Sequence, residues 1–186
     1  MVLVALSGCS LQRERDLYVL GGDPPIRSQF VSVLNRPIVR IERVGFPDYL
    51  DTTDIIAQDG DRVVASVTGR WADPLSKEAT RAVAQSLTTQ LPYVLVTIWE
   101  QVERPSFTLD INIDTFERES AECVLSGRWT ITGKDGNQLA KEDFMIVTPI
   151  KDSHDATVAA AMTEDLDQLT KRIAAVLRGL VPPGPV

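Results

Sequence analysis

The sequence has few of the residues on which catalytic and disulfide-stapled proteins depend. Its 186 residues include two cysteines and one histidine. It contains no G-x-S-x-G elbow, no glycine-rich phosphate loop and no pair of cysteines at metal-ligand spacing. Two cysteines also cannot form the bridge framework of a small secreted domain. We therefore expect no enzymatic activity, no cofactor and no metal site.

Basic residues and long apolar runs are also scarce. The chain has 19 Lys and Arg residues against 26 Asp and Glu residues, which gives a formal net charge of −7. Nucleic-acid binding requires a concentrated basic face, so we expect no nucleic-acid partner. No apolar run approaches the ~20 residues that a membrane-spanning helix needs. Length and composition instead indicate one acidic globular domain.

The first ten residues, MVLVALSGCS, place Cys9 directly after a short apolar run. The stretch LSGC is similar to the lipobox at which bacterial lipoproteins are cleaved and acylated, so Cys9 is the predicted lipid attachment site. The apolar run is shorter than the ~7–15 residues of a usual signal core, and no Lys or Arg precedes it. We therefore expect the native start to lie upstream of Met1. A buried N-terminal strand with a core cysteine is the alternative, which the polar run QRERD at 12–16 disfavours.

Acylation of Cys9 would anchor the protein to a membrane without spanning it. In Gram-negative bacteria an aspartate after the cysteine favours retention at the inner membrane. Ser10 stands there instead, so we expect an outer-membrane lipoprotein. The chain then divides into a signal (1–9), a tether (10–16), a single α+β periplasmic domain (17–180) and a proline-rich tail (181–186). Even fully extended at ~3.3–3.6 Å per residue, the tether keeps the domain within about 25 Å of the lipid.

Past the tether, strand patterns alternate with two amphipathic helices. The expected strands are 17–20, 37–47, a hairpin over 55–67 with a three-residue turn at Asp59–Asp61, 93–99, 107–116, 122–131 and one that ends at 144–147. Residues 93–99 are apolar on both faces, which predicts an interior strand. In 107–116 and 122–131, alternate apolar residues indicate one buried face each.

The helices are expected from Asp73-Pro74 to Pro92 and over 155–178, the second ending at Gly179. Asp73 is the predicted cap of the first helix, and Asp152 and Asp155 are predicted to cap the second. Together these elements predict an α+β fold: a mixed, mostly antiparallel sheet of about seven to eight strands, with both amphipathic helices packed on one face.

Three features that could suggest a chemical site are better explained by structure. His154 lies in KDSHD at a helix start, where polar residues gather by default. Asp110, Asn112 and Asp114 match the opening of a calcium loop, but Thr115 stands where such a loop requires glycine. Strand alternation places these three side chains on one solvated face. Cys123 alternates with inward residues and is expected to be a small buried hydrophobe without a disulfide partner.

Several segments together carry a family resemblance. They are FPDYL (46–50), IIAQDGDRV (55–63), WADPLSKE (71–78), DINIDTFE (110–117), SGRWTITGKDGNQLA (126–140) and AAAMTEDLDQLTKRIAAVL (159–177). In this order and behind a lipobox, they resemble the ABC-type transport auxiliary lipoprotein family, the PqiC-like or YmbA-like proteins. The resemblance implies an outer-membrane lipoprotein that faces the periplasm and is an accessory subunit of an intermembrane lipid transport system that supports the cell envelope. It further implies an MCE-domain tunnel protein as partner and assembly into a homo-oligomer.

A subunit of this kind would act through contact. Phe46, Tyr49 and Trp71 lie beside turn-forming residues, and we predict them as partner contacts. Rings that close the ends of the core are the alternative explanation of these positions. For the whole protein, the alternative function is a free-standing periplasmic lipoprotein that acts as a scaffold or binds a small apolar ligand.

Overall fold

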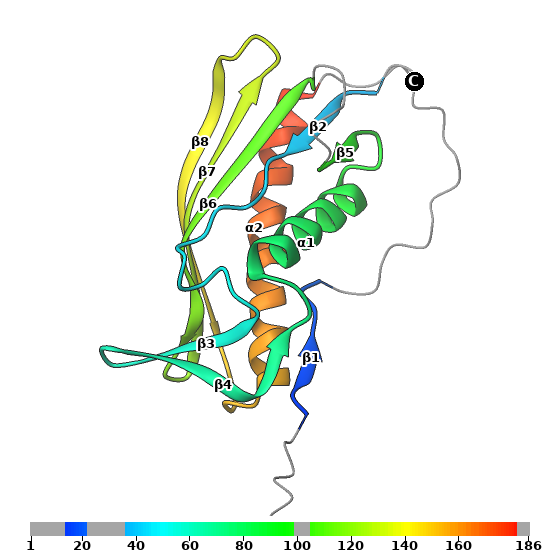
Figure 1. Cartoon of the computed structure of the whole chain (residues 1–186). Coiled ribbons are helices and arrows are strands. Elements are labelled where there is room, and N and C mark those ends of the chain that lie inside the picture. The colour runs from blue at the N-terminus through cyan, green and yellow to red at the C-terminus, as the bar shows by residue number, and fades with distance from the viewer. Residues whose placement is uncertain (1–13, 22–35, 99–104, 182–186) are drawn as a thin grey trace, which may run out of the picture.

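The computed structural model describes residues 14–21, 36–98 and 105–181. These residues form a mixed eight-stranded sheet and two helices (Figure 1), which confirms the predicted α+β fold. In chain order the elements are β1 (Asp16–Tyr18), β2 (Ile38–Ile41), β3 (Asp54–Asp59), β4 (Arg62–Trp71), α1 (Leu75–Gln90), β5 (Leu95–Thr97), β6 (Phe107–Glu119), β7 (Glu122–Gly133), β8 (Gln138–Pro149) and α2 (Asp155–Leu180).

Strand β6 organises the sheet. One of its edges pairs with β7 in a long antiparallel ladder, and β7 pairs in the same way with β8. The other edge is shared: β2 runs parallel to the beginning of β6, and β3 runs parallel to its end. Strands β5 and β4 extend these two parts outward, and β1 adds to β4 in parallel. The long ladders are antiparallel, whereas the parallel pairings are short.

The chain between β2 and β3 fills the gap left on the shared edge of β6. The amide of Gly45 donates to the carbonyl of Ile111 at 2.9 Å, and the amide of Ile113 donates to the carbonyl of Gly45 at 2.8 Å. A Cβ atom at Gly45 would lie 2.5 Å from the Oδ1 atom of Asn112, so glycine permits this close approach. The strand expected over 37–47 is therefore a short strand, β2, followed by a segment pinned to β6.

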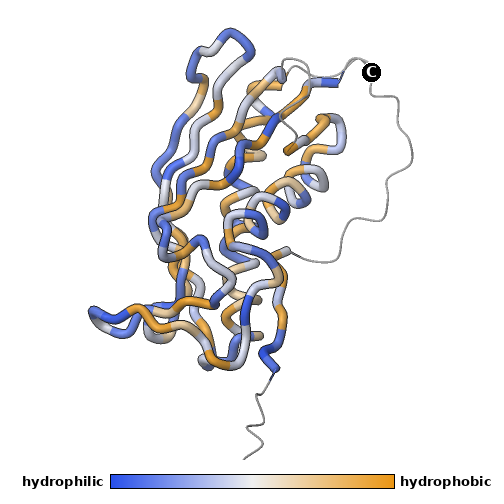
Figure 2. Tube along the Cα trace, viewed as in Figure 1, coloured by the Kyte–Doolittle hydropathy of each residue, from blue (hydrophilic) through white to orange (hydrophobic). Residues whose placement is uncertain are grey.

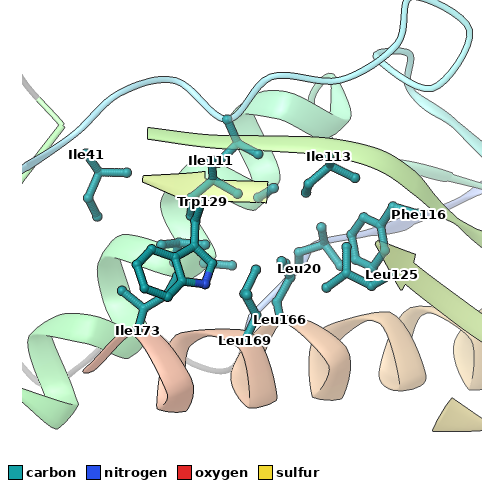
Figure 3. Close-up of a cluster of buried hydrophobic side chains, with 14 of the residues drawn as sticks. Leu20, Ile41, Ile111, Ile113, Phe116, Leu125, Trp129, Leu166, Leu169 and Ile173 are labelled. Carbon is teal, nitrogen blue, oxygen red and sulfur yellow. The ribbon is translucent and has the colours of Figure 1, made fainter. Parts of the chain in front are cut away.

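The core lies between the sheet and the helices, which pack on the same face of it (Figure 1). Figure 3 shows Ile111 and Trp129 of the sheet directed toward Leu169 and Ile173 of α2. Trp129 is 1% exposed, as the alternation of β7 predicts. Six further buried residues of β6 and β7 follow the expected pattern: Phe107, Leu109, Ile113, Cys123, Leu125 and Ile131.

A β-bulge shifts this alternation within β6. Ile113 pairs with Gly127 and Thr115 pairs with Ser126, so Asp114 is an extra residue. Inward positions are odd-numbered before the bulge, and Phe116 is the inward residue after it. Gly127 has φ 158°, and a Cβ there would overlap the Asn112 carbonyl and lie 2.9 Å from the Cα of Ile113. The register shift therefore requires glycine at this position.

The predicted helix caps are wrong for both helices. In α1, Pro74 occupies the N-cap position and no side chain caps from there. Remote groups bond the first amides instead: Leu75 donates to the Thr52 carbonyl at 3.1 Å, and Ser76 donates to Asp51 Oδ1 at 3.0 Å. The loop before β3 is held against the start of α1, so it supplies the acceptors that Asp73 was expected to supply.

In α2, His154 is the N-cap residue and makes no side-chain capping bond. Asp152 accepts bonds from the backbone N and Nδ1 atoms of His154, at 3.0 and 2.8 Å. Asp155 accepts from Ser66 Oγ at 2.9 Å and from Thr68 Oγ1 at 2.6 Å, so it joins α2 to β4. The helix also continues through Gly179 and ends at Leu180.

Two strand predictions also need correction. The 93–99 run yields only β5, which pairs with β2 at one end of the described sheet and is half-buried, so the interior assignment is wrong. Tyr93 belongs to the turn after α1, where the amide of Val94 donates to the carbonyl of Leu91 at 3.0 Å. In the predicted hairpin, Asp59 pairs with Arg62, so the turn has two residues and Gly60 takes φ 59°.

Candidate interaction site

The predicted lipid attachment and sorting residues, Cys9 and Ser10, lie outside the described residues and stay predictions. The described chain reaches β1 through Arg15, whose Nη1 atom is 2.7 Å from Asp54 Oδ1. Parallel pairing of β1 with Gly69–Trp71 then fixes the start of the domain to β4. An anchor on Cys9 would therefore be connected to the domain at the end of the sheet that β1 and β4 form.

The predicted contact residues Phe46 and Tyr49 lie in the loop that is pinned to β6. The ring of Phe46 is half-buried and stacks on Phe116, with ring centroids 6.2 Å apart. Tyr49 is 44% exposed, and its hydroxyl donates to Glu117 Oε1 at 3.1 Å. The loop thus leaves Tyr49 partly exposed to solvent, while its hydroxyl is bonded to Glu117 of the sheet.

Glu117 explains why Tyr49 keeps this position. Its side chain is buried, and its Oε2 atom has no hydrogen-bond partner within the described chain. Burial raises the pKa of the Glu117 carboxyl, the hydrogen bond from Tyr49 lowers it, and nearby Glu119 raises it. Burial and the Glu117 carboxylate also raise the pKa of Tyr49. Sequence reasoning missed Glu117 because its partner Tyr49 lies 68 positions away in the chain, and no local pattern indicates that contact.

Trp71 is not a surface residue. Its side chain is 1% exposed at the end of β4, and its amide donates to the carbonyl of Thr53 at 2.7 Å. The prediction that its ring faces a partner is therefore wrong. Gly69, two positions earlier, is also buried, so strand alternation places Trp71 on the core side. Of the three predicted contacts, Tyr49 is the one with a substantially exposed ring.

In a buried cluster between the sheet and α2, only the burial of Cys123 was predicted from the sequence, and Cys123 is buried as expected. Asp165 is fully buried and accepts a 2.5 Å hydrogen bond from Thr148 Oγ1. Burial raises the pKa of Asp165 to about 7 and that of the Cys123 thiol to about 12. A buried thiol with so high a pKa stays protonated and unreactive near neutral pH, so this cluster is structural.

One exposed apolar surface that sequence reasoning missed is the β3–β4 hairpin. We call residues 58–67 the arm. It extends from the body of the molecule (Figure 1), and behind a hydrophilic tip it carries hydrophobic residues on its β4 strand (Figure 2). Val63, Val64 and Val67 are 55%, 40% and 79% exposed. Strand alternation alone would have buried one face of this hairpin.

The residues considered above for chemical roles do not converge. Asn112 Nδ2 donates to Asp110, its neighbour on the same strand, and His154 is exposed beside Asp152. Within residues 14–21, 36–98 and 105–181, no group of three or more His, Cys, Asp or Glu side chains is arranged to hold a metal ion. Among these residues there is also no helix with the length and hydrophobicity needed to cross a bilayer.

Known proteins share both the sequence pattern and the fold. The chain is 27% identical over 146 residues to the intermembrane transport lipoprotein PqiC of Escherichia coli (strain K12), covering 76% of this chain and 75% of that protein. The Shigella flexneri protein of the same name matches to the same extent.

Two crystal structures share the fold. An uncharacterized protein superposes with a TM-score of 0.74 at 20% identity, covering 88% of this chain and 98% of the other. Protein XCC0632 from Xanthomonas campestris superposes with a TM-score of 0.67 at 16% identity, covering 88% and 91%.

The family match extends over almost all of the described chain. The model of the family described as "ABC-type transport auxiliary lipoprotein component" matches residues 18–174, from β1 to the last turns of α2. This range includes the loop with Tyr49, the arm and the buried cluster around Asp165. The predicted relationship is thus confirmed, and the chain belongs to the ABC-type transport auxiliary lipoprotein component family.

Proposed function

We propose that this protein is a non-enzymatic accessory subunit of an intermembrane lipid transport system, held on the outer membrane and facing the periplasm. The observation that carries the proposal is the family match over residues 18–174. The relatives named as intermembrane transport lipoproteins support the same role. In this role the protein helps an ABC/MCE-type system to move lipid between the membranes and so maintains the cell envelope.

The anchor is the acylated Cys9. Several acyl chains, each contributing about 0.8 kcal/mol per buried methylene, hold a protein on a membrane durably. Ser10 directs the lipoprotein to the outer membrane. The short tether that follows keeps β1 next to the lipid, so the domain works at the membrane surface where a tunnel would deliver or collect its cargo.

The partners are an MCE-domain tunnel protein and further copies of this chain. Contact at the Tyr49 loop is supported by its geometry: the loop is pinned to β6 at Gly45, while the Tyr49 ring is 44% exposed. A rigidly held aromatic ring supplies contact area at low entropic cost. The protein acts through shape and binding and has no catalytic group in this proposal.

The test is co-purification of the tunnel protein from envelope membranes after mild cross-linking, using a C-terminally tagged chain. We expect an MCE-domain protein to elute with the wild type. Tyr49→Ala should weaken this association or the homo-oligomer on a sizing column. Tyr49→Phe is the matched control, because it keeps the ring and removes only the hydroxyl bonded to Glu117.

Two results would contradict the proposal. If the wild type elutes without an MCE-domain protein both with and without cross-linking, a free-standing envelope lipoprotein is the better description. If Tyr49→Ala unfolds the domain while its folded fraction still assembles, the docking surface lies elsewhere. Thermal unfolding of both variants separates lost contact from lost structure.

A further inference from the structure

The arm is a β-hairpin that, along most of its length, no other part of the described chain covers on either face. Residues 58–65 are exposed on both faces of the two strands. In the described structure, β1 pairs with β4 only at Gly69–Trp71, so β4 has β3 alone as a neighbour along residues 62–65. A two-stranded hairpin that buries neither face is only marginally stable in water. A hairpin with exposed valines therefore indicates a surface that is covered in the working protein.

Exposed apolar side chains gather at this end of the molecule. The described chain has eleven large hydrophobic residues that are exposed, and five of them lie on β1, just after it or on β4. Besides the three valines of the arm, they are Leu17 at 61% and Val19 at 59% exposure. These strands are neighbours in the sheet, so their apolar residues belong to one end of the domain.

The anchor would emerge from the same end. Figure 1 shows β1, β3 and β4 at one end of the molecule and the β7–β8 turn at the opposite end. Only the six residues from Ser10 to Arg15 separate the predicted acylated cysteine from β1, which begins at Asp16. Fully extended, the chain from Cys9 to Asp16 spans about 25 Å, so the membrane that holds Cys9 lies within reach of the β1–β4 end.

We propose that the arm, together with Leu17 and Val19, rests on the surface of the membrane in which Cys9 is anchored. The inference depends on the acylation of Cys9 that the proposed function includes. Asp59, Asp61 and Arg62 at the tip are charged, so the arm lies along the lipid surface and does not pierce it. Because the acyl chains hold the domain at the bilayer, the valines on the face of the arm that meets the lipid suffice to orient it without binding lipid by themselves.

The chain offers a suitable background for testing this with single cysteines. Cys123 is 0% exposed and Cys9 would carry lipid, so neither should react with a thiol probe. The lipidated Val67→Cys variant is labelled with an environment-sensitive fluorophore and reconstituted into phosphatidylcholine vesicles. Leu139→Cys is the matched control, because Leu139 is 45% exposed but lies beside the β7–β8 turn. Quenching by doxyl-labelled phosphatidylcholine reports contact with lipid.

We expect doxyl lipid to quench the probe at position 67 at least threefold more strongly than the probe at 139. Equal and weak quenching at both sites would overturn the inference. It would also be overturned if the probe at position 67 were shielded from water in a way that depends on protein concentration and not on lipid, because the arm would then face another copy of the chain. Val63→Cys repeats the measurement if Val67→Cys fails to fold. Palmitate labelling of the same preparations is read separately, because its absence contradicts the anchor itself and not only the position of the arm.

Discussion

Asp165 makes the stability of this protein depend on pH in an unusual direction. Its carboxyl is fully buried between α2 and the sheet, where Thr148 donates to Oδ1 and Oδ2 has no partner within the described chain. The pKa of Asp165 is raised from 3.8 to about 7, mainly by burial. Folding therefore favours the protonated, neutral form of this side chain.

The sign and size of the effect follow from linkage. A carboxyl whose folded pKa is raised contributes its full stability below the unfolded pKa and loses it as pH rises toward the folded pKa. For Asp165 that window runs from 3.8 to about 7. At 1.36 kcal/mol per pKa unit, the whole window corresponds to at most about 4 kcal/mol, and the part above pH 5 to about 2–3 kcal/mol.

The measurement is chemical denaturation of the wild type and Asp165→Asn at pH 5 and pH 8. The wild type should lose about 2–3 kcal/mol more than the variant over this interval, because Asn is isosteric with the neutral acid and does not ionise. The lower limit of pH 5 keeps Asp152 ionised throughout the measurement. Bonds from His154 hold the pKa of Asp152 at about 2, so the stability that its ionised form contributes is lost only as the pH falls below the ordinary value of 3.8.

Two further variants test whether the pH dependence comes from Asp165. Asp135→Asn, at an exposed aspartate of the β7–β8 turn, should leave the pH profile of the wild type unchanged. Thr148→Val should steepen it, because the hydrogen bond from Thr148 lowers the pKa of Asp165. If the wild type and Asp165→Asn profiles run parallel between pH 5 and pH 8, Asp165 does not take up a proton on folding and its pKa is not raised in the folded protein.

Other predictions concern two glycines, one beside the β-bulge and one in α2, and the N-terminus. Gly127→Ala should lower the free energy of unfolding by more than about 2 kcal/mol in a urea titration, because its Cβ would overlap the backbone of β6. Gly179→Ala, with no atom within 4 Å of the new Cβ, should instead be neutral or stabilising by up to about 1 kcal/mol. Cys9→Ala should abolish palmitate labelling, and unchanged labelling would rule out the lipobox. Ser10→Asp should move the protein to the inner-membrane fraction on a sucrose gradient, whereas a wild type already found there would refute the outer-membrane assignment.

Local periodicity was enough to predict most of the elements and much of the core. The alternation through Leu109 and Ile111 marks the inward face of β6, and the stripe through Leu169 and Ile173 marks the buried face of α2. These patterns are readable because strands repeat every two residues and helices every 3.6, whatever lies opposite them. The family resemblance rests on the same local segments, so it too could be predicted from the sequence.

The burial and hydrogen-bond partners of the candidate site residues depend on contacts between residues that are far apart in the chain. Only the fold shows that Asp51 bonds the first turn of α1, that Trp71 is covered by the core, and that Tyr49 reaches a glutamate 68 positions away. The Asp114 bulge and the exposure of the arm are also tertiary outcomes, since the same alternating pattern serves a strand with a covered face and a strand without one. Periodicity states which side chains share a face, whereas burial and hydrogen-bond partners are set by what packs against that face.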